Sequence, residues 1–268
     1  MLEAKEVNFA YVHGHPVLFD INCTIQDGEF LALLGHNGSG KTTLSRLFMA
    51  LDHPRSGQIL VDGEDIVNYE PADLADKIGY VFQNPDLQIL EDTVYDEIAY
   101  GPRTKKLTEF NVKHQVEEAM DVMGLTELRN AYPRLLSFGQ KRRLGVAAAL
   151  ALNPRTLILD EITNGQDALE KERMMKYLQT ICKTRGITIV LISHDMDMVL
   201  RYAERAIVLN DGEMVFDGSP QKLFDGTNPV ESWGLRRPVV ASIATSLGVE
   251  ATTPAELCEK FSVKVGVR

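Results

Sequence analysis

The stretch FLALLGHNGSGKTT at residues 30–43 decides the fold of this chain. Residues 30–34 are all apolar and suit a short buried strand. The residues from Gly35 to Thr42 match the pattern G-x-x-x-x-G-K-[ST] in full, and residues 42–51 then suit a helix that opens at this loop. This order of strand, glycine-rich loop and helix is the context that a phosphate-binding loop requires.

The residue types in this loop predict its chemistry. Glycines allow backbone N–H groups to turn inward around phosphate oxygens, Lys41 would neutralise the β and γ phosphates, and the Thr42 hydroxyl would bind Mg²⁺. A chance glycine-rich loop is the alternative, and the strand and helix on either side argue against it. The sequence therefore predicts ATP and Mg²⁺ as ligands. The residues assigned to them are Gly35, His36, Asn37, Gly38, Ser39, Gly40, Lys41, Thr42 and Thr43.

A second apolar segment, TLILDE at 156–161, ends in two carboxylates. Placing acids at the end of a buried strand is costly unless they meet a cation or a reacting water. Asp160 is placed to support the Mg²⁺ shell, and Glu161 to orient and polarise the attacking water. An apolar run that ends in two acids is common and indicates little alone. Together with the phosphate-binding loop it indicates a nucleotide site.

Short apolar segments bounded by turn residues predict strands early in the chain and again after residue 155. These strands are expected at 2–9, 21–26, 30–34, 57–61, 156–160 and 187–193, with a helix at 168–184 between the last two. A strand, helix, strand order of this kind implies a parallel sheet. The segments AIVLN and EMVF around Asp211-Gly212 predict a β-hairpin.

Two further regions are predicted to be helical. Apolar residues recur at helical spacing through residues 85–155, most clearly at 111–123 and 140–152. Beyond about residue 217 the chain carries short-helix start signals, which predict a small helical C-terminal segment. These signals are Ser219-Pro220, Asn228-Pro229, and Thr253-Pro254 with Glu256 in the position of a capping box.

The composition excludes several classes of protein. A formal charge of −10 and a pI near 5.1 argue against a general nucleic-acid binder. Cys23, Cys182 and Cys258 are widely separated and form no C-x-x-C pair, which favours a reducing cytosol over a disulfide framework or a zinc site. No apolar run approaches the roughly 20 residues that span a bilayer, and the start of the chain has no apolar signal region. We therefore expect any membrane role to act through partners.

The motifs in this order resemble the ABC ATPase family over residues 1–216. The family-specific element is LSFGQ at 136–140, which is similar to the LSGGQ signature and precedes the helical stretch QKRRLGVAAALAL. A serine and a glycine at a helix N-terminus form an anion site. The resemblance implies that Ser137, Gly139 and Gln140 face the γ-phosphate held by a partner subunit, so that ATP lies between two chains. As an isolated motif, the same residues would suit an ordinary helix cap.

Four further residues match the family in order. Gln83, in GYVFQNPD, resembles the Q-loop glutamine that contacts Mg²⁺ or the attacking water, and Asp167, in NGQD, resembles the D-loop aspartate at the dimer interface. His194 resembles the switch histidine that contacts the γ-phosphate. Tyr11 resembles the aromatic residue that stacks on adenine, although Phe9 is close by and either ring could be core. Each residue alone would suit a surface or structural role, and only the order of motifs favours function.

The family implies an α/β fold of the P-loop NTPase class. We expect a RecA-like parallel-sheet core, an antiparallel β subdomain and an inserted helical subdomain at about 85–155. The nucleotide-binding domain would span 1–216, and a helical dimerisation segment would follow at 217–268.

The chain departs from the family pattern at three positions. Phe138 replaces the first glycine of LSGGQ and puts a bulky side chain where a backbone should approach phosphate. We expect this change to weaken the signature, and a Phe138→Gly change to raise turnover. A heterodimer would then have one intact and one impaired site, whereas a homodimer would have the defect in both. Ile162 and Gln166 replace a proline and a leucine whose side chains are not expected to touch nucleotide.

Two features favour one group within the family. FQNPDLQIL at 82–90 resembles the energy-coupling factor (ECF) group, whose motif opens a helix that docks onto a transmembrane protein. The tail from GSPQKLF to TPAELCEKF is similar to the C-terminal segment that helps the two ATPases of that group dimerise. The resemblance implies an importer of vitamins or of cobalt or nickel ions, driven by hydrolysis of Mg-ATP.

The implied partners are a second ATPase subunit, a transmembrane coupling protein and a substrate-binding membrane protein, with this chain peripheral at the cytoplasmic face of the cell membrane. The ATPase of a non-ECF ABC transporter is the main alternative. A DNA-repair or chromosome-type ABC ATPase would carry a long coiled coil, for which there is no room between Gln83 and Ser137. A non-hydrolysing scaffold would be expected to lack Glu161 or His194.

Overall fold

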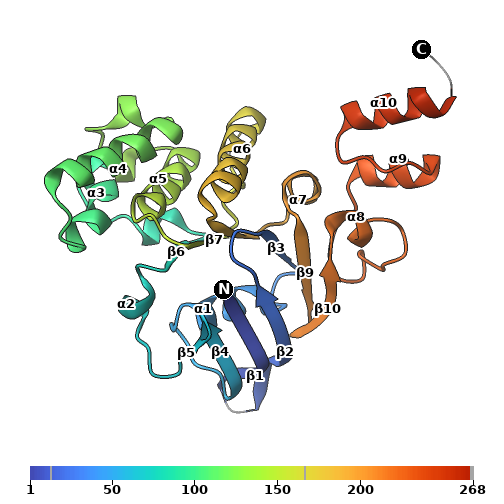
Figure 1. Cartoon of the computed structure of the whole chain (residues 1–268), viewed down its shortest axis with the longest axis horizontal. Helices are drawn as coiled ribbons and strands as arrows, with labels where there is room; N and C mark the ends of the chain where they lie inside the picture. The colour runs from blue at the N-terminus through green and yellow to red at the C-terminus, as the bar shows by residue number, and fades with distance from the viewer. Residues whose placement is uncertain (13, 166, 266–268) are drawn as a thin grey trace. The chain divides into compact units, whose positions relative to one another are not determined.

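The computed structural model describes residues 1–12, 14–165 and 167–265, and the chain forms two compact units (Figure 1). The first unit combines Met1–Asn68 with Ile192–Arg268, and the second is Tyr69–Leu191. Both contain parallel strand pairs, and the first also has an antiparallel sheet, which confirms the expected α/β fold class. Among the described residues, no helix has the length and apolar character needed to cross a bilayer.

The antiparallel sheet of the first unit has the strand order β2-β1-β4-β5. Its strands are β1 (Leu2–Val12), β2 (His15–Ile25), β4 (Ser56–Val61) and β5 (Glu64–Asp65). Alternate residues at the end of β2, Ile21, Cys23 and Ile25, are buried, as period-two patterning requires for a sheet with one covered face. β2 begins earlier than the sequence predicted because its first half, which is mostly exposed, pairs with the end of β1.

A second group of strands in this unit carries the glycine-rich loop. β3 (Phe30–Leu34) is fully buried and pairs in parallel with β9 (Arg205–Asn210), which pairs antiparallel with β10 (Glu213–Gly218). The predicted hairpin is confirmed: Asp211 and Gly212 have φ of 49° and 83°, the left-handed values that a tight two-residue turn needs. The loop after β3 leads into helix α1 (Lys41–Phe48).

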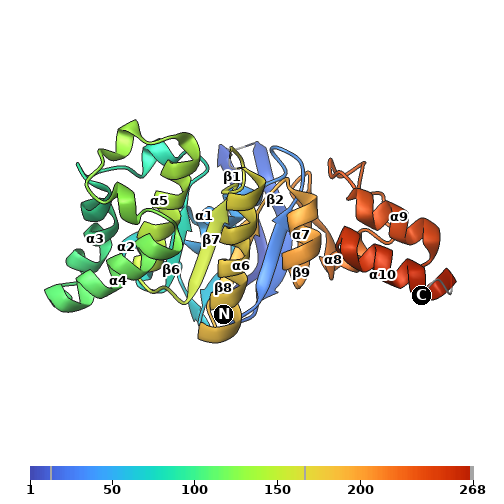
Figure 2. The same ribbon diagram turned by 90° about the horizontal axis from the view of Figure 1, so that it is seen from above.

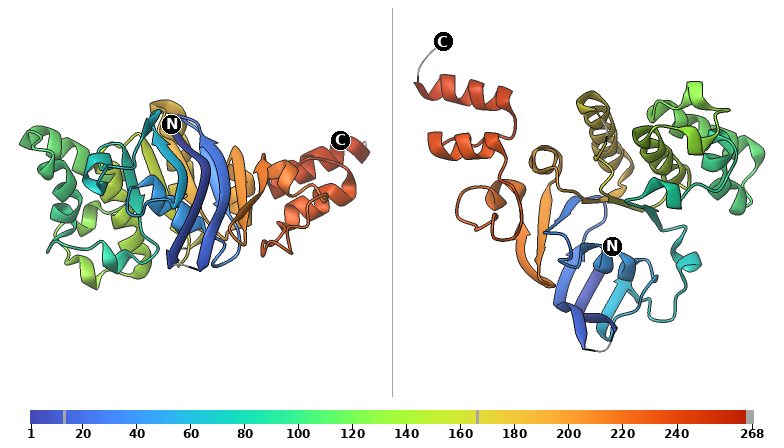
Figure 3. Two further views of the ribbon diagram at one scale, coloured as in Figure 1. Left: turned by 90° about the horizontal axis from the view of Figure 1, so that it is seen from below. Right: turned by 180° about the vertical axis from the view of Figure 1, so that it is seen from behind.

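The C-terminal part of the first unit is helical. It contains α7 (Met196–Tyr202), α8 (Pro220–Leu223), α9 (Val239–Leu247) and α10 (Pro254–Val265), and Figure 3 shows α9 and α10 side by side beyond α8. The helix start expected at Asn228-Pro229 is wrong. Turns occupy this segment, because the Asn228 side chain donates to the carbonyl of Lys222 at 2.9 Å and ends α8 instead.

The start of α10 agrees with the sequence in part. The Thr253 hydroxyl accepts a hydrogen bond from the Glu256 N–H at 3.2 Å, as a helix cap should. The Glu256 carboxylate, however, accepts from the backbone N–H of Thr252 rather than from that of Thr253. The box is therefore closed one residue earlier than predicted.

The strands of the second unit form a parallel core. β6 (Ile78–Val81) pairs in parallel with β7 (Thr156–Asp160), and β8 (Thr188–Ile192) lies on the other side of β7. Helix α6 (Ala168–Arg185) connects β7 to β8 as predicted, and Figure 2 shows it running beside them. All residues of β7 and β8 are buried, as expected for strands covered on both faces.

Helices fill the rest of the second unit. The short helix α2 (Pro71–Leu74) precedes β6. Between β6 and β7 lie α3 (Val94–Thr104), α4 (Glu109–Val122) and α5 (Phe138–Ala151), with single 3₁₀ turns at Pro85–Leu87, Thr126–Leu128 and Pro133–Leu135. α3, α4 and α5 pack against one another (Figure 1). Residues 85–155 are thus mostly helical, as their periodicity predicted.

Burial decides how the three cysteines react. Cys23 on β2 and Cys182 on α6 are buried, whereas Cys258 on α10 is exposed. Desolvation raises the pKa of Cys23 to about 12, so its reactive thiolate is scarce at neutral pH. We expect a disulfide reagent to modify only Cys258 quickly in the native protein at about pH 7.5, and all three cysteines in denaturant. Rapid reaction of any thiol in a native Cys258→Ser variant would contradict this packing.

Candidate nucleotide site

The glycines of the loop after β3 have conformations that other residues avoid. Gly35, Gly38 and Gly40 have φ of 141°, 85° and 105°. A Cβ at Gly35 would lie 2.1 Å from the Leu209 carbonyl oxygen, and one at Gly40 would lie 2.5 Å from a methyl carbon of Leu18. The loop can therefore follow this tight path only with glycine at these positions.

Lys41 lies inside the loop and is only 6% exposed. Its Nζ donates to the carbonyl oxygens of Gly35 and His36, at 2.9 and 2.8 Å. The Ser39 hydroxyl is also buried, and Oγ has no hydrogen-bond partner among the described residues. A buried ammonium and an unsatisfied hydroxyl in one glycine loop fit an anionic ligand, because phosphate oxygens would satisfy both.

Thr42 and Thr43 begin helix α1 on different sides. Thr42 is exposed at the first turn, as a hydroxyl that binds Mg²⁺ would have to be, whereas Thr43 is buried and its Oγ1 lies 3.1 Å from the Tyr11 hydroxyl. No group of three or more His, Cys, Asp or Glu side chains in the described ranges could hold a metal by itself.

The structure distinguishes the two aromatic residues near the start of the chain. Phe9 is 6% exposed and belongs to the core, whereas Tyr11 is 52% exposed. The rings meet edge to face with centroids 4.8 Å apart. Tyr11 is thus the ring with a free face for stacking.

His194 follows β8 directly and is exposed. The next residue, Asp195, caps helix α7 by accepting from the Met198 N–H at 3.3 Å. The short connection therefore fixes the backbone on both sides of His194 and leaves the imidazole accessible.

In the second unit, the two carboxylates at the end of β7 have different surroundings. Asp160 is 5% exposed and accepts a hydrogen bond from the Tyr80 hydroxyl of β6 at 3.1 Å. Glu161 is partly exposed and has a left-handed φ of 52°, which points the chain away from the strand. Its Oε2 accepts from Gln83 Nε2 at 2.7 Å and from Asn164 Nδ2 at 3.0 Å.

This arrangement brings together two loops that are distant in the sequence. Gln83 lies after β6, whereas Glu161 and Asn164 share the segment between β7 and α6. A carboxylate that accepts from two amides keeps further lone pairs for a water molecule, which is what a general base requires. The predicted pairing of Gln83 and Glu161 in one site is therefore compatible with the geometry.

The FQNPD motif is built differently from the expected helix. Asn84 caps only the 3₁₀ turn Pro85–Leu87 by accepting from the Asp86 N–H at 3.1 Å. Gln88 then holds the end of β6, because its side chain accepts from the Phe82 N–H at 3.0 Å and donates to the Tyr80 carbonyl at 3.2 Å. Leu87 and Leu90 beside it are 72% and 67% exposed.

The signature residues form the N-terminus of α5. Ser137 Oγ accepts from the Gln140 N–H at 3.3 Å, and Gln140 Oε1 accepts from the Ser137 N–H at 2.9 Å. This complete capping box occupies both side chains, while Gly139 is buried in the first turn. Both the cap and the anion site expected from the sequence thus belong to the same helix end.

The D-loop lies beside the signature within the second unit. Asp167 caps α6 by accepting from the Glu170 N–H at 2.8 Å. A Cβ at Gly165 would lie 2.9 Å from the Phe138 ring, so the ring packs directly on this glycine. Gln166 lies outside the described residues.

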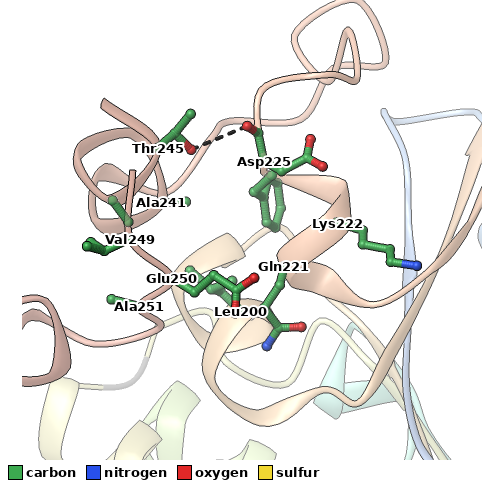
Figure 4. Close-up of a pocket in the computed structure, with 11 residues that line it drawn as sticks. Leu200, Gln221, Lys222, Asp225, Ala241, Thr245, Val249, Glu250 and Ala251 are labelled. Carbon is green, nitrogen blue, oxygen red and sulfur yellow. Dashed lines mark hydrogen bonds between the residues drawn. The ribbon is translucent and has the colours of Figure 1, made fainter. Parts of the chain in front are cut away.

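A separate cavity of about 140 Å³ lies among α7, α8 and α9. Figure 4 shows the small apolar side chains of Ala241 and Ala251 at its wall, with Thr245 hydrogen-bonded to the Asp225 carbonyl at its edge. None of the residues predicted to bind nucleotide lines it.

Several contacting residues were missed at the sequence level. Tyr80, Asn164, Gln88 and Arg142 touch Asp160, Glu161 or the backbone of the Q-loop. Asn164 and Gln88 lie in motifs that the sequence contains, but their contacts, like those of Tyr80 and Arg142, depend on how the loops and strands fold and cannot be read from residue order.

Comparisons with known proteins agree with this fold. The family model described as ABC transporter matches residues 18–164. A putative ABC transporter ATP-binding protein of Methanosarcina mazei is 44% identical over 236 residues, 87% of this chain and 40% of that protein. The energy-coupling factor transporter ATP-binding protein EcfA2 of Clostridium perfringens is 37% identical over 254 residues, 92% of this chain and 89% of that protein.

A solved structure is also similar. It is that of cbiO1 from Clostridium perfringens, described as part of the ABC transporter complex cbiONQ, with a TM-score of 0.77 and 36% identity over 90% of this chain and 97% of that one. The chain spans between 39% and 46% of the length of several curated relatives.

The fold and the phosphate-binding loop define an ATP-binding cassette. The chain belongs to the ABC transporter family of ATP-binding proteins. Within that family, its similarity extends to the ECF ATPases.

Proposed function

We propose that this protein hydrolyses Mg-ATP as the ATPase subunit of an ABC importer. The observation that carries the proposal is the glycine loop. Phosphate oxygens would bind its buried Lys41 ammonium and its Ser39 hydroxyl, which has no hydrogen-bond partner among the described residues. The second is Glu161, whose carboxylate is held by amide donors in the way that suits a general base.

The residues would divide the work as follows. The loop from Gly35 to Thr43 binds the phosphates, Thr42 and Asp160 serve Mg²⁺, and Mg²⁺ itself would neutralise charge on the phosphates. Glu161 orients and polarises the attacking water, with Gln83 beside it. His194 supplies a further contact to the γ-phosphate, and Tyr11 stacks on adenine.

We further propose that two ATPase chains enclose the nucleotide. The N-terminus of α5 is the positive end of the helix dipole, which favours anions. Ser137, Gly139 and Gln140 would face the γ-phosphate on the partner chain, and Asp167 would lie at the interface. Phe138 is 47% exposed at this helix end.

The ECF type is the transporter class we favour. It is supported by the FQNPD segment with its exposed leucines and by similarity to EcfA2 over most of both chains. The subunit would dock from the cytoplasmic face onto a transmembrane coupling protein that carries a substrate-binding membrane protein. The cargo would be a vitamin or a cobalt or nickel ion, which this chain itself does not contact.

Purification from membranes tests this function. The tagged chain, extracted in mild detergent, is expected to carry with it a small integral coupling protein and a second ATPase or a substrate-binding membrane protein, identified by mass spectrometry. A pair of large permease subunits would favour a non-ECF ABC transporter. Recovery only from the soluble fraction, with no membrane partner, would contradict a role in transport.

A further inference from the structure

Arg142 on helix α5 is a buried cation that reaches two catalytic loops. It is 4% exposed, and its guanidinium donates through Nη1 to the backbone carbonyl of Glu161. Nη2 donates to the backbone carbonyl of Gln83 at 3.3 Å. A planar guanidinium can bind two carbonyls at fixed angles, which a point charge such as an ammonium cannot do.

The surroundings of Arg142 keep it in this place. The Phe138 ring covers the guanidinium, with the guanidinium carbon 4.6 Å from the ring centroid, a distance typical of a cation–π contact. The same ring packs on Gly165 of the D-loop. Burial lowers the pKa of Arg142, and the negative charges of Glu161 and Asp160 oppose that shift.

We propose that Arg142 is a positioning residue, which holds the backbones of Glu161 and Gln83 so that their side chains meet 2.7 Å apart. In this role it acts through the two backbone carbonyls that it binds. The inference rests on the proposed ATPase function and adds a residue to it. Ser137 caps the helix that carries Arg142. Arg142 therefore also links the signature, which we propose contacts the partner's ATP, to the general base of this chain.

This role gives Phe138 a purpose that the motif comparison did not predict. The ring that interrupts LSGGQ lies between Arg142 and the D-loop. A Phe138→Gly change would uncover Arg142 while it frees the approach to phosphate, and these two effects on turnover have opposite signs. The test is therefore made at Arg142.

Two variants separate position from charge. Arg142→Met keeps an unbranched stem but has no guanidinium and no donor, and Arg142→Lys keeps the charge but can serve only one carbonyl well. We expect Arg142→Met to lower kcat for ATP hydrolysis about 10–100-fold with KM for ATP changed less than about twofold, and Arg142→Lys to recover part of the loss.

A matched control is Arg129→Met. The Arg129 guanidinium also covers an aromatic ring, that of Tyr95 at 4.0 Å, and pairs with Glu117 at 3.3 Å, but it touches no catalytic loop. The kcat of the Arg129→Met variant is expected to stay within about twofold of the wild-type value. All rates are normalised to the number of Mg-ATP sites measured by equilibrium binding, so that a poorly folded fraction does not count as lost catalysis.

The decisive measurement combines Arg142→Met with Glu161→Gln. If Arg142 acts through Glu161, the double variant turns over as slowly as Glu161→Gln alone in single-turnover assays. A further loss in the double variant, or an unchanged kcat in Arg142→Met, would overturn the inference. A wild-type protein that neither binds nor hydrolyses Mg-ATP would instead refute the proposed function, before any variant is compared.

Discussion

The Glu161→Gln protein is expected to hydrolyse ATP about 10²–10⁴-fold more slowly than the wild type while binding Mg-ATP equally well. The amide keeps the size of the carboxylate and can still accept from Gln83 or Asn164, so the loops should keep their places. It cannot take a proton from water, so the loss falls on the chemical step. Steady-state phosphate release and equilibrium binding of Mg-ATP measure the two quantities separately.

The control for this change is Glu127→Gln, which removes an exposed carboxylate in the same unit. Its turnover should equal that of the wild type. Retained hydrolysis in Glu161→Gln would mean that another residue acts as the general base, and loss of binding would mean that Glu161 has a structural role instead.

The second large effect is expected at Lys41. Lys41→Ala should raise the Kd for Mg-ATP at least about 10–100-fold, because a hydrogen bond from a charged donor contributes about 1.5–3 kcal/mol. The buried ammonium also donates hydrogen bonds to the carbonyls of Gly35 and His36, so the variant loses these bonds within the loop as well. Turnover should fall with binding at moderate ATP concentrations. Isothermal titration with Mg-ATP measures the affinity.

Lys5→Ala is the comparison for Lys41→Ala, because Lys5 is an exposed lysine that forms an ion pair with Glu3 at 2.9 Å. Its affinity for Mg-ATP should not change. An unchanged Kd in Lys41→Ala would remove the phosphate-binding role of the loop, and with it the basis of the proposed function.

The glycine loop could be predicted from the sequence because its geometry is local. Gly35, Gly38 and Gly40 need left-handed or otherwise strained backbone, and their spacing alone sets the path around phosphate. The hairpin at Asp211-Gly212 is local in the same sense. The order of strands and helices followed from periodicity, which reports only which face of an element is buried.

The contacts around Asp160 and Glu161 were decided by the tertiary structure. Tyr80 and Asp160 are 80 residues apart, and Gln83 and Glu161 are 78 apart, so they meet only because β6 pairs with β7 in one register. The side chain of Arg142 reaches both loops because α5 packs beside these strands.

Phe138 shows most clearly the difference between what the sequence predicts and what the tertiary structure decides. The sequence established that a bulky ring replaces a signature glycine, and it predicted a penalty from that change. Only the structure showed that the ring covers Arg142 and packs on Gly165. Similarly, Phe9 and Tyr11 are equivalent in the sequence, and burial alone makes one ring core and leaves the other exposed. A local backbone conformation restricts which residue types can occupy each position, so it can be predicted from a short segment. Long-range contacts depend on strand register and packing, which no short segment specifies.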